Sequence, residues 1–336
     1  MEEIRVGVIG SGRMGKIRVE NLSKMPGVEV VTLVTQDIDD ILPWAHTWGI
    51  SNITDDASRI FEDESITAVV ICSPTDSHAE YVKQAARCGK HIFCEKPIAN
   101  GVAETKEVLD VVAAAGVVFQ LGFNRRYDPN FIKLKELCSS GELGDIHVIN
   151  ISSRDPVRPA IEFVAHSGGM FVDMMIHDFD MLRYLTGSEI VEVYANGEVL
   201  IDPRIGEADD VDTAVVVVKL ANGAICTIDN SRETHYGYDQ RVEVFGSKGS
   251  AYAKNKTGHN VEVSTKEGVE KDRPLHYLVE RYMDSFGVEI RGFISALRQG
   301  IPPTVGGVDG LKALLGSVAA DQSARENRPV RISSVK

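Results

Sequence analysis

The chain has 336 residues, of which 43% are hydrophobic and 25% are charged, a composition typical of a globular protein. Its formal net charge of −13 argues against a nucleic-acid partner, because a polyanion would be repelled. No apolar run approaches the about twenty residues of a membrane span, and the acidic start MEEIRVGVIG is unlike a secretory signal. The length predicts two domains. The charge leaves small molecules or further copies of the chain as the expected partners.

Cysteine usage points to a reducing compartment. The five cysteines are an odd number without close pairing, and no C-x-x-C motif occurs. This pattern argues against a disulfide framework and against a structural zinc site. We therefore expect reduced thiols and a cytoplasmic protein.

The first third of the chain alternates short apolar runs with helix-like segments. The apolar runs predict strands at residues 4–10, 28–35, 68–74, 91–97 and 117–123. The segments between them predict helices at 15–25, 77–89 and 102–116. This alternation predicts a doubly wound parallel sheet of the Rossmann type, with helices on both faces.

After residue 123 the pattern changes to strands with few long helices between them. Strands are predicted at 145–154, 190–199, 211–220, 223–230, 240–246 and 260–265, and helices at 130–141, 168–186, 286–299 and 309–325. Asn222 and Gly223 separate two of these strands and predict an antiparallel hairpin. We therefore expect an α/β protein: a Rossmann domain over residues 1–122, and an α+β domain with a large, mostly antiparallel, open-faced sheet over residues 123–336.

The segment GVIGSGRMG carries a G-x-G-x-x-G pattern at Gly10, Gly12 and Gly15, directly after the first predicted strand. In this context the glycines allow a tight turn, close approach of a pyrophosphate, and close packing of helix and strand. The following helix N-terminus adds N–H groups for the phosphates. A strand–helix turn with chance glycines is the alternative, but the alternating context favours dinucleotide binding.

The residues after the second predicted strand bear on the choice of cofactor. Counting from the glycines, the acid that usually binds the adenosine ribose falls at Thr35, and Asp37 could replace it. No Lys or Arg lies between residues 25 and 58, so Arg13 is the one local candidate for holding a 2′-phosphate. We expect NAD as the cofactor, with NADP possible.

An acid and a histidine stand out in the apolar segment GGMFVDMMIHDFDM, residues 168–181. Asp173 and His177 are four residues apart, so on a helix they project from one face. They could form a structural hydrogen bond, bind a metal or take part in catalysis; a single well-placed histidine without a nearby cysteine disfavours zinc. Lys96, in FCEKPIAN, follows the fourth predicted strand at the edge where such sheets bind ligands, although a surface Lys–Glu pair is the alternative.

Several motifs occur in one order along nearly the whole chain: the glycine loop, CSPTDSHAEY, CEKP, GFNRRYD, SRDP, GGMFVDMMIHDFDM and YGYDQRVEVFGSKG. Together they resemble the Gfo/Idh/MocA oxidoreductase family, and most closely its inositol 2-dehydrogenases. The resemblance implies NAD(P)-dependent oxidation of a secondary alcohol of a cyclic polyol, with myo-inositol converted to 2-keto-myo-inositol. A dehydrogenase of scyllo-inositol or a pyranose sugar, an NAD-dependent glycosidase of the same fold, and a dinucleotide sensor without catalysis are the alternatives.

The resemblance also implies roles for individual residues. Lys96, Asp173 and His177 would surround the reacting carbinol, with His177 as general base, Lys96 as the cation beside the developing alkoxide, and Asp173 orienting the imidazole or binding a neighbouring hydroxyl. The cofactor would be bound by Gly10, Gly12, Arg13, Met14, Gly15, Thr35, Asp37, Ser73, Pro74, His78, Glu95, Lys96 and Pro97. The substrate would be bound by Lys96, Asn124, Arg125, Asp155, Asp173, His177, Tyr236 and Tyr238.

Some of these residues have structural alternatives, and the resemblance also bears on assembly. Arg125 could belong to a structural ion pair and Asp155 could cap a turn. Tyr236 and Tyr238 would share one face of a strand, although each could be a packed edge tyrosine. The resemblance implies a homodimer or homotetramer formed through the open face of the second sheet. The apolar run Val215–Val218 is compatible with that face or with burial under helices.

Overall fold

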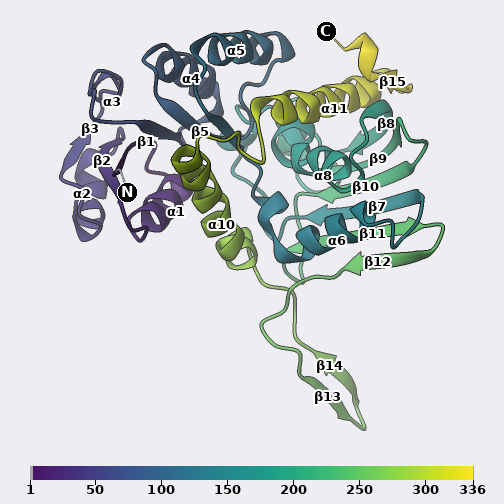
Figure 1. Ribbon diagram of the computed structural model, residues 1–336. Coiled ribbons are helices and arrows are strands. Elements are labelled where there is room, and N and C mark those ends of the chain that lie inside the picture. The colour runs from purple at the N-terminus through teal and green to yellow at the C-terminus, as the bar shows by residue number, and fades with distance from the viewer. Residues whose placement is uncertain (1–2, 336) are drawn as a thin grey trace. The chain divides into compact units, whose positions relative to one another are not determined.

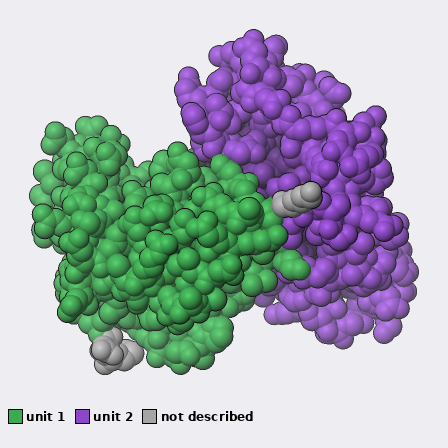
Figure 2. Space-filling view, turned by 90° about the horizontal axis from the view of Figure 1, so that it is seen from above, with its two compact units in different colours: residues 1–127, 284–312 green, residues 128–283, 313–336 purple. Residues whose placement is uncertain are grey.

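The computed structural model describes residues 3–335, which form two compact units (Figure 2). Unit 1 comprises the described residues up to Tyr127 together with Asp284–Lys312. Unit 2 comprises Asp128–Met283 together with the described residues from Ala313 onward. The sequence-based division at residues 122 and 123 places 284–312 in the second domain, whereas these residues belong to unit 1.

Unit 1 is built on six parallel strands in the order β3-β2-β1-β4-β5-β6 (Figure 1). The strands are β1 (Ile4–Ile9), β2 (Val28–Val34), β3 (Asn52–Thr54), β4 (Ala68–Ile71), β5 (His91–Glu95) and β6 (Phe119–Gly122). All four residues of β4 are buried, as expected for a central parallel strand that is covered on both faces. The predicted Rossmann arrangement is confirmed.

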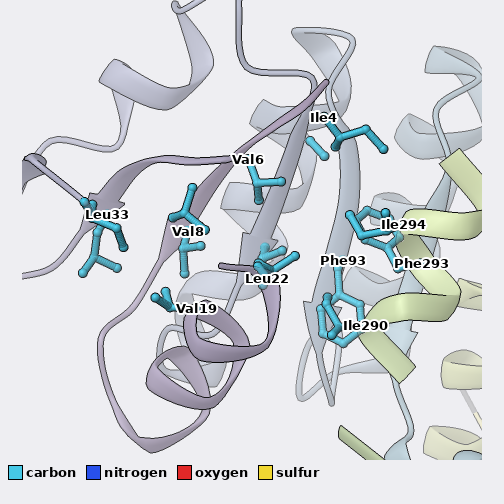
Figure 3. Packing of buried hydrophobic residues seen from close by; sticks show 14 of the residues in the cluster. Ile4, Val6, Val8, Val19, Leu22, Leu33, Phe93, Ile290, Phe293 and Ile294 are labelled. Carbon is cyan, nitrogen blue, oxygen red and sulfur yellow. The ribbon is translucent and has the colours of Figure 1, made fainter. Parts of the chain in front are cut away.

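The helices of unit 1 explain why residues 284–312 return to it. They are α1 (Arg13–Leu22), α2 (Ile38–Thr47), α3 (Ser58–Phe61), α4 (His78–Arg87), α5 (Val102–Ala115) and most of α10 (Leu278–Gln299). Ile290, Phe293 and Ile294 of α10 are at most 2% exposed and pack in one core with β1 and α1 (Figure 3). The ring of Phe293 meets that of Phe93 edge-on, with centroids 5.9 Å apart. Burial of these side chains stabilises the return of the chain to unit 1.

Residues 36–61 contain elements that the sequence pattern does not predict. They form α2, β3 and α3, with Pro43 inside α2. Proline lacks the N–H that a helix interior requires, so the sequence disfavours a helix there. Burial of Ile41 and Ala45 against the core stabilises α2.

Unit 2 is built on a seven-stranded sheet in the order β12-β11-β7-β10-β9-β8-β15 (Figure 1). The strands are β7 (Ile146–Arg154), β8 (Ile190–Glu198), β9 (Thr213–Leu220), β10 (Ile225–Ser231), β11 (Asp239–Gly246), β12 (Gly249–Ala253) and β15 (Val330–Arg331). Within the described part of the chain, only β7 and β10 of this sheet pair in parallel, so the sheet is mostly antiparallel, as predicted. The hairpin of β9 and β10 is confirmed, and Gly223 supplies its turn with a φ of +93°.

One face of the seven-stranded sheet is covered and the other is open. The helices of unit 2 are α6 (Pro129–Ser139), α7 (Ile161–Val164), α8 (Ile176–Thr186), α9 (Pro203–Glu207) and most of α11 (Gly307–Glu326). Along β9, Val216 and Val218 are fully buried, while Val215 and Val217 are 51% and 41% exposed. Strand side chains alternate between faces, so the exposed valines mark the open face.

Unit 2 also contains a short hairpin that belongs to neither large sheet. Its strands are β13 (Glu262–Thr265) and β14 (Gly268–Lys271), and every residue in them is exposed. None of the helices formed by residues 3–335 is long and apolar enough to span a bilayer.

Candidate active site

The glycine loop joins β1 to α1 at the carboxyl edge of the parallel sheet. Gly10 has a φ of +100°, and a Cβ there would lie 2.6 Å from the backbone of Cys72. A Cβ on Gly15 would lie 1.9 Å from the carbonyl oxygen of Gly10, so only glycine allows this approach. A Cβ on Gly12 would have open space around it among the described residues. This cradle beside the N-terminus of α1 fits the pyrophosphate of NAD.

The end of β2 is tied to the glycine loop through hydroxyl groups. Arg13 and Met14 begin α1. Thr35 Oγ1 lies 2.6 Å from Ser11 Oγ and accepts a 3.1 Å hydrogen bond from the backbone N–H of Asp37. Thr35 is 6% exposed, whereas Asp37 is exposed. Thr35 therefore fixes the loop, and Asp37 is the accessible carboxylate at this strand end.

His78 joins the loops that follow β4 and β5. Its Nδ1 lies 2.7 Å from the carbonyl oxygen of Pro97, and its Nε2 lies 2.9 Å from that of Ser73. Burial lowers the pKa of His78 despite the opposing effect of these two hydrogen bonds. Both ring nitrogens are directed at backbone carbonyls, so His78 positions the Ser73–Pro74 loop and the Lys96–Pro97 turn. Contact of His78 with the cofactor stays a prediction.

The carboxylate of Glu95, also predicted to contact the cofactor, is bound inside unit 1. Glu95 Oε1 accepts hydrogen bonds from Arg18 Nε at 2.9 Å and from Arg18 Nη2 at 2.7 Å. Arg18 is fully buried, and its Nη2 also lies 2.5 Å from Glu289 Oε2. The rings of Phe93 and Phe286 flank its guanidinium at 4.5 and 5.3 Å. Glu95 therefore anchors the end of β5, and its contact with the cofactor stays a prediction.

Lys96 and the Asn124–Arg125 pair follow the neighbouring strands β5 and β6. Lys96 is half-buried, and its peptide bond to Pro97 is cis. Asn124 and Arg125 lie in the 3-10 turn η2 (Asn124–Tyr127) and are 6% and 5% exposed. Among the described residues, Asn124 Nδ2 is buried without a hydrogen-bond partner. A buried unpaired amide fits a site that receives a polar ligand.

In unit 2, the segment with Asp173 begins as a π-helical turn rather than as the α-helix predicted over 168–186. The turn (η3, Met170–Met174) is followed by Met175 and then by α8. Gly168 and Gly169 precede it with φ values of +85° and +80°, which only glycine adopts readily. The N–H of Met175 bonds the carbonyl of Met170, five residues back. This turn sets the direction of Asp173 relative to α8.

Asp173 and His177 are nevertheless both partly accessible. From Met170 to Leu182 every residue is buried except these two, which are partly exposed. The apolar residues between them pack into unit 2, among them Phe171, Ile176 and Phe179. The apolar residues therefore anchor this segment. What Asp173 and His177 bind stays a prediction.

A polar anchor fixes α8 next to His177. Asp178 is fully buried, and its Oδ1 accepts a 2.7 Å hydrogen bond from Ser153 Oγ on β7. Its Oδ2 accepts a 3.1 Å hydrogen bond from Asn230 Nδ2 on β10. The first turn of α8 is thus bonded to both strands of the parallel pair.

Two functional candidates lie at the carboxyl ends of that parallel pair, and sequence reasoning found only one. Asp155, directly after β7, donates its backbone N–H to the carbonyl of Ser231 at 2.9 Å. Arg232, directly after β10, donates from Nη1 to Asp173 Oδ2 at 3.4 Å. Its sequence neighbourhood, NSRETHYG, has no local signal, because the ion pair joins residues 59 positions apart.

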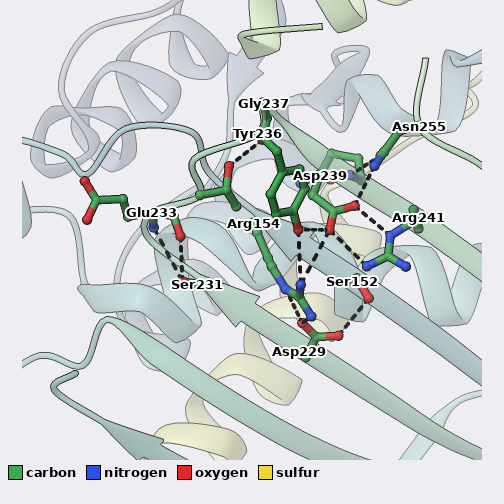
Figure 4. A network of polar contacts seen from close by, with 12 residues as sticks. Ser152, Arg154, Asp229, Ser231, Glu233, Tyr236, Gly237, Asp239, Arg241 and Asn255 are labelled. Atoms are coloured by element: carbon green, nitrogen blue, oxygen red, sulfur yellow. Dashed lines mark hydrogen bonds and ion pairs between the residues drawn. The ribbon is translucent and has the colours of Figure 1, made fainter. Parts of the chain in front are cut away.

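The two predicted tyrosines do not share a strand face. Gly237 lies between them with a φ of +117°, and β11 begins only at Asp239. Tyr236 is 42% exposed; its hydroxyl donates to Asp239 Oδ2 at 2.6 Å and accepts from Arg154 Nη1 at 3.2 Å (Figure 4). Tyr238 is 7% exposed, and its ring packs edge-on against another tyrosine ring. The shared-face prediction is wrong because the positive φ of Gly237 turns the chain.

The chemistry available at these residues is polar and acid–base. Unit 1 offers the ammonium of Lys96 and the buried amide of Asn124. Unit 2 offers the imidazole of His177 and the carboxylates of Asp155 and Asp173. Within residues 3–335, no group of three or more His, Cys, Asp and Glu side chains is arranged to hold a metal ion.

Comparison with known proteins covers both halves of the chain. Residues 4–123 match the model described as an oxidoreductase family with an NAD-binding Rossmann fold, and residues 131–252 match the GFO/IDH/MocA C-terminal domain. The myo-inositol 2-dehydrogenase of Thermotoga maritima is 43% identical, with 99% of each chain covered.

Solved structures give the same result. A probable dehydrogenase from Thermotoga maritima superposes with a TM-score of 0.96 at 43% identity, covering 99% of this chain and all of that one. The scyllo-inositol dehydrogenase of Lactobacillus casei, solved with NAD(H) and scyllo-inositol, superposes with a TM-score of 0.92 at 29% identity, covering 99% and 100%. The chain therefore belongs to the Gfo/Idh/MocA family of oxidoreductases, and its N-terminal part is an NAD-binding Rossmann domain.

Proposed function

We propose that this protein oxidises a secondary alcohol of a cyclic polyol with NAD, and that its substrate is myo-inositol, which becomes 2-keto-myo-inositol. The observation that supports this most is the partial exposure of Asp173 and His177 in an otherwise buried segment. An acid and an imidazole suit alcohol oxidation, which requires removal of a proton from oxygen. We assign cofactor binding to residues 1–122 and substrate binding to residues 123–336.

NAD, when bound, accepts the hydride from the carbinol carbon. Gly10, Gly12 and Gly15 would admit its pyrophosphate at the start of α1. Asp37 would face the adenosine ribose, since Thr35 is engaged with Ser11. The other cofactor contacts proposed are at Arg13, Met14, Ser73, Pro74, His78, Glu95, Lys96 and Pro97.

His177 would remove the hydroxyl proton. An unperturbed histidine has a pKa of about 6.5, which suits proton exchange near neutrality, and such a base typically contributes ~10²–10⁴-fold in rate. Lys96 would stabilise the developing negative charge on the oxygen. Asp173, acting as a carboxylate, would accept a hydrogen bond from a neighbouring hydroxyl or from the imidazole.

A polyol also needs directed contacts away from the reacting carbon. Asn124 would supply its buried, unpaired Nδ2 as a donor. Arg125, Asp155, Tyr236 and Tyr238 are the further contacts proposed. The hydroxyl of Tyr236 is already bonded to Asp239 and Arg154, so its contact would have to join that network.

The test is a panel of myo-inositol, scyllo-inositol and D-glucose with NAD and with NADP, followed by the absorbance of the reduced cofactor. We expect the highest kcat/KM with myo-inositol and NAD. The scyllo-inositol dehydrogenase among the similar structures makes that isomer the second candidate. Binding of NAD without reduction by any polyol would contradict the proposal, and release of a sugar from a glycoside without net NADH would point to a glycosidase.

We also propose that copies of the chain associate through the open face of the seven-stranded sheet, as a dimer or tetramer. The support is the row of exposed apolar residues on that face: Val215, Val217, Ile225, Phe245 and Tyr252. Val217→Glu should lower the mass measured by light scattering to that of a smaller species. Val269→Glu, which is on the β13–β14 hairpin and 58% exposed, is the control and should leave the mass unchanged. An unchanged mass in both variants would contradict this interface.

The cytoplasm remains the compartment we propose. Cys94 and Cys226 are buried free thiols, and burial raises the pKa of the Cys226 thiol to about 12. Protonated, buried thiols suit a reducing environment.

A further inference from the structure

We propose that Arg232, together with Asp210, positions the carboxylate of Asp173, so that the ion pair forms part of the substrate site although Arg232 itself is not a catalytic residue. This inference rests on the proposed function, because it assumes that Asp173 contacts the substrate or the base.

The burial of Arg232 is the first step. Its side chain is 1% exposed, and a guanidinium removed from water is tolerated only when it is paired. Its two terminal nitrogens bind different acids: Nη1 donates to Asp173 Oδ2 at 3.4 Å, and Nη2 donates to Asp210 Oδ2 at 3.2 Å. Arg232 is therefore built into the interior next to Asp173.

Asp210 connects the same arginine to the start of the π-helical turn. Its Oδ1 accepts a 2.8 Å hydrogen bond from the backbone N–H of Met170, the first residue of η3. A Cβ on Gly169 would lie 2.8 Å from this oxygen, so glycine is required for the approach. Arg232 thus binds both ends of the turn: Met170 through Asp210, and Asp173 directly.

The backbone that presents Arg232 is fixed as well. The N–H of Arg232 donates to the carbonyl of Asp212 at 2.9 Å. The Asp212 carboxylate is fully buried and accepts the N–H groups of Leu200, Ile201 and Asp202 at 2.8–3.0 Å. The guanidinium is therefore supported from a rigid loop, as a group that orients a reacting side chain must be.

The geometry assigns to the Arg232–Asp173 ion pair the role of orienting the Asp173 carboxylate. Arg232 occupies Oδ2 of Asp173 and holds the carboxylate in one orientation. Without the guanidinium, Asp173 and Asp210 would lose their shared cation, and Asp173, whose side chain is 20% exposed, would reorient toward solvent. A displacement of about 1 Å in such a group can cost on the order of 10²-fold in rate.

The experiment compares Arg232→Met, Arg232→Lys and Asp210→Asn with a control, Arg183→Met. Arg183 lies near the other end of α8, where it donates to Glu189 from Nε at 3.0 Å and from Nη2 at 2.9 Å. The steady-state measurement is kcat and KM for myo-inositol at saturating NAD. The second measurement is hydrogen exchange of the peptide that covers residues 170–175, recorded without substrate or cofactor.

For Arg232→Met we expect kcat/KM to fall about 100-fold, and amide exchange in 170–175 to accelerate. Arg232→Lys keeps the positive charge but lacks the two terminal guanidinium nitrogens that bind separate acids. Its kcat/KM should be about tenfold higher than that of Arg232→Met. Asp210→Asn keeps an acceptor for Met170 and should have a smaller effect than Arg232→Met. Arg183→Met should change neither kcat/KM nor exchange in 170–175.

Two results would overturn the inference: Arg232→Met with kcat/KM no lower than Arg183→Met, or unchanged exchange in 170–175. Failure of the proposed function gives a different result. In that case the wild type reduces no cofactor with any polyol, while the exchange of 170–175 still responds to Arg232→Met and not to Arg183→Met.

Discussion

Each unit contains a buried arginine that binds two carboxylates close to a residue of the proposed reaction centre. The two arginines differ in whether they bind that residue itself or its neighbour in the chain. In unit 1, Arg18 binds Glu95 and Glu289, and Lys96 is the next residue along the chain from Glu95. In unit 2, Arg232 binds Asp173 itself. Arg18 therefore fixes the backbone beside a proposed catalytic group, whereas Arg232 fixes the group.

The difference indicates where a substitution should have its effect. A buried arginine that supports only the fold should lower the free energy of unfolding when it is removed. One that orients a reacting carboxylate should also lower turnover. The two units therefore allow the contributions of support and chemistry to be measured separately.

The largest effect is expected from the lysine that Arg18 supports indirectly. Lys96→Ala removes the proposed cation, and kcat should fall by at least ~10³-fold. The free energy of unfolding should stay within about 0.5 kcal/mol of the wild type, because the Arg18–Glu95 pair remains. Turnover is measured with myo-inositol and NAD, and stability by urea denaturation. Lys133→Ala, at a lysine that is 65% exposed, is the control, and a Lys96→Ala variant with normal turnover would contradict the role of Lys96.

The second-largest effect is expected on the free energy of unfolding, when Arg18 in unit 1 is replaced. Arg18→Met leaves Glu95 and Glu289 close together without their cation, and breaking a buried ion pair costs about 3–5 kcal/mol. The matched control is Arg5→Met in the same unit, where the partner Glu29 is 46% exposed and the loss should be about 1 kcal/mol or less. Equal losses of unfolding free energy in the two variants would show that burial of Arg18 with Glu95 and Glu289 adds nothing to stability.

The structural features of the two units that depend on local sequence patterns can be predicted from the sequence. Apolar runs and the Asn222–Gly223 turn predict the strands of both sheets except β3, β12 and β15. The spacing of Asp173 and His177 predicts that they project from one face of a helical segment, and both residues are partly exposed there. The glycine pattern predicts the cradle at Gly12.

Both buried arginines escape such prediction for a common reason. Arg18 pairs with residues 77 and 271 positions away, and Arg232 with residues 59 and 22 positions away. No local period links partners at these separations, so an arginine in a sequence looks like a surface residue until the fold is known. The π-helical turn is also bonded to a distant residue, Asp210, and the chain after Gly237 is bonded to Leu275 through the backbone N–H of Tyr238.

A further difference between the clusters concerns their outer carboxylates. Both oxygens of Asp210 accept hydrogen bonds, one from Arg232 and one from Met170. Glu289 Oε1 is buried without a hydrogen-bond partner among the described residues. Burial raises the pKa of Glu289 to about 8, against the opposing effect of Arg18. The stability contributed by Arg18, Glu95 and Glu289 should therefore depend on pH through the protonation of Glu289.

The smallest effect is expected for Glu289→Gln and depends on pH. A glutamate with a folded-state pKa near 8 and an ordinary value near 4.5 retains a proton on folding between these pH values, so wild-type stability falls as pH rises through this window. The glutamine side chain of the variant has no proton to lose. Near pH 5 the variant should match the wild type within about 1 kcal/mol, and near pH 9 it should be the more stable by on the order of 1–3 kcal/mol. Urea denaturation at the two pH values measures this difference. A variant that is less stable than the wild type at pH 9 would mean that ionised Glu289 is held favourably by Arg18, and that the unit 1 arginine balances both acids as fully as Arg232 does in unit 2.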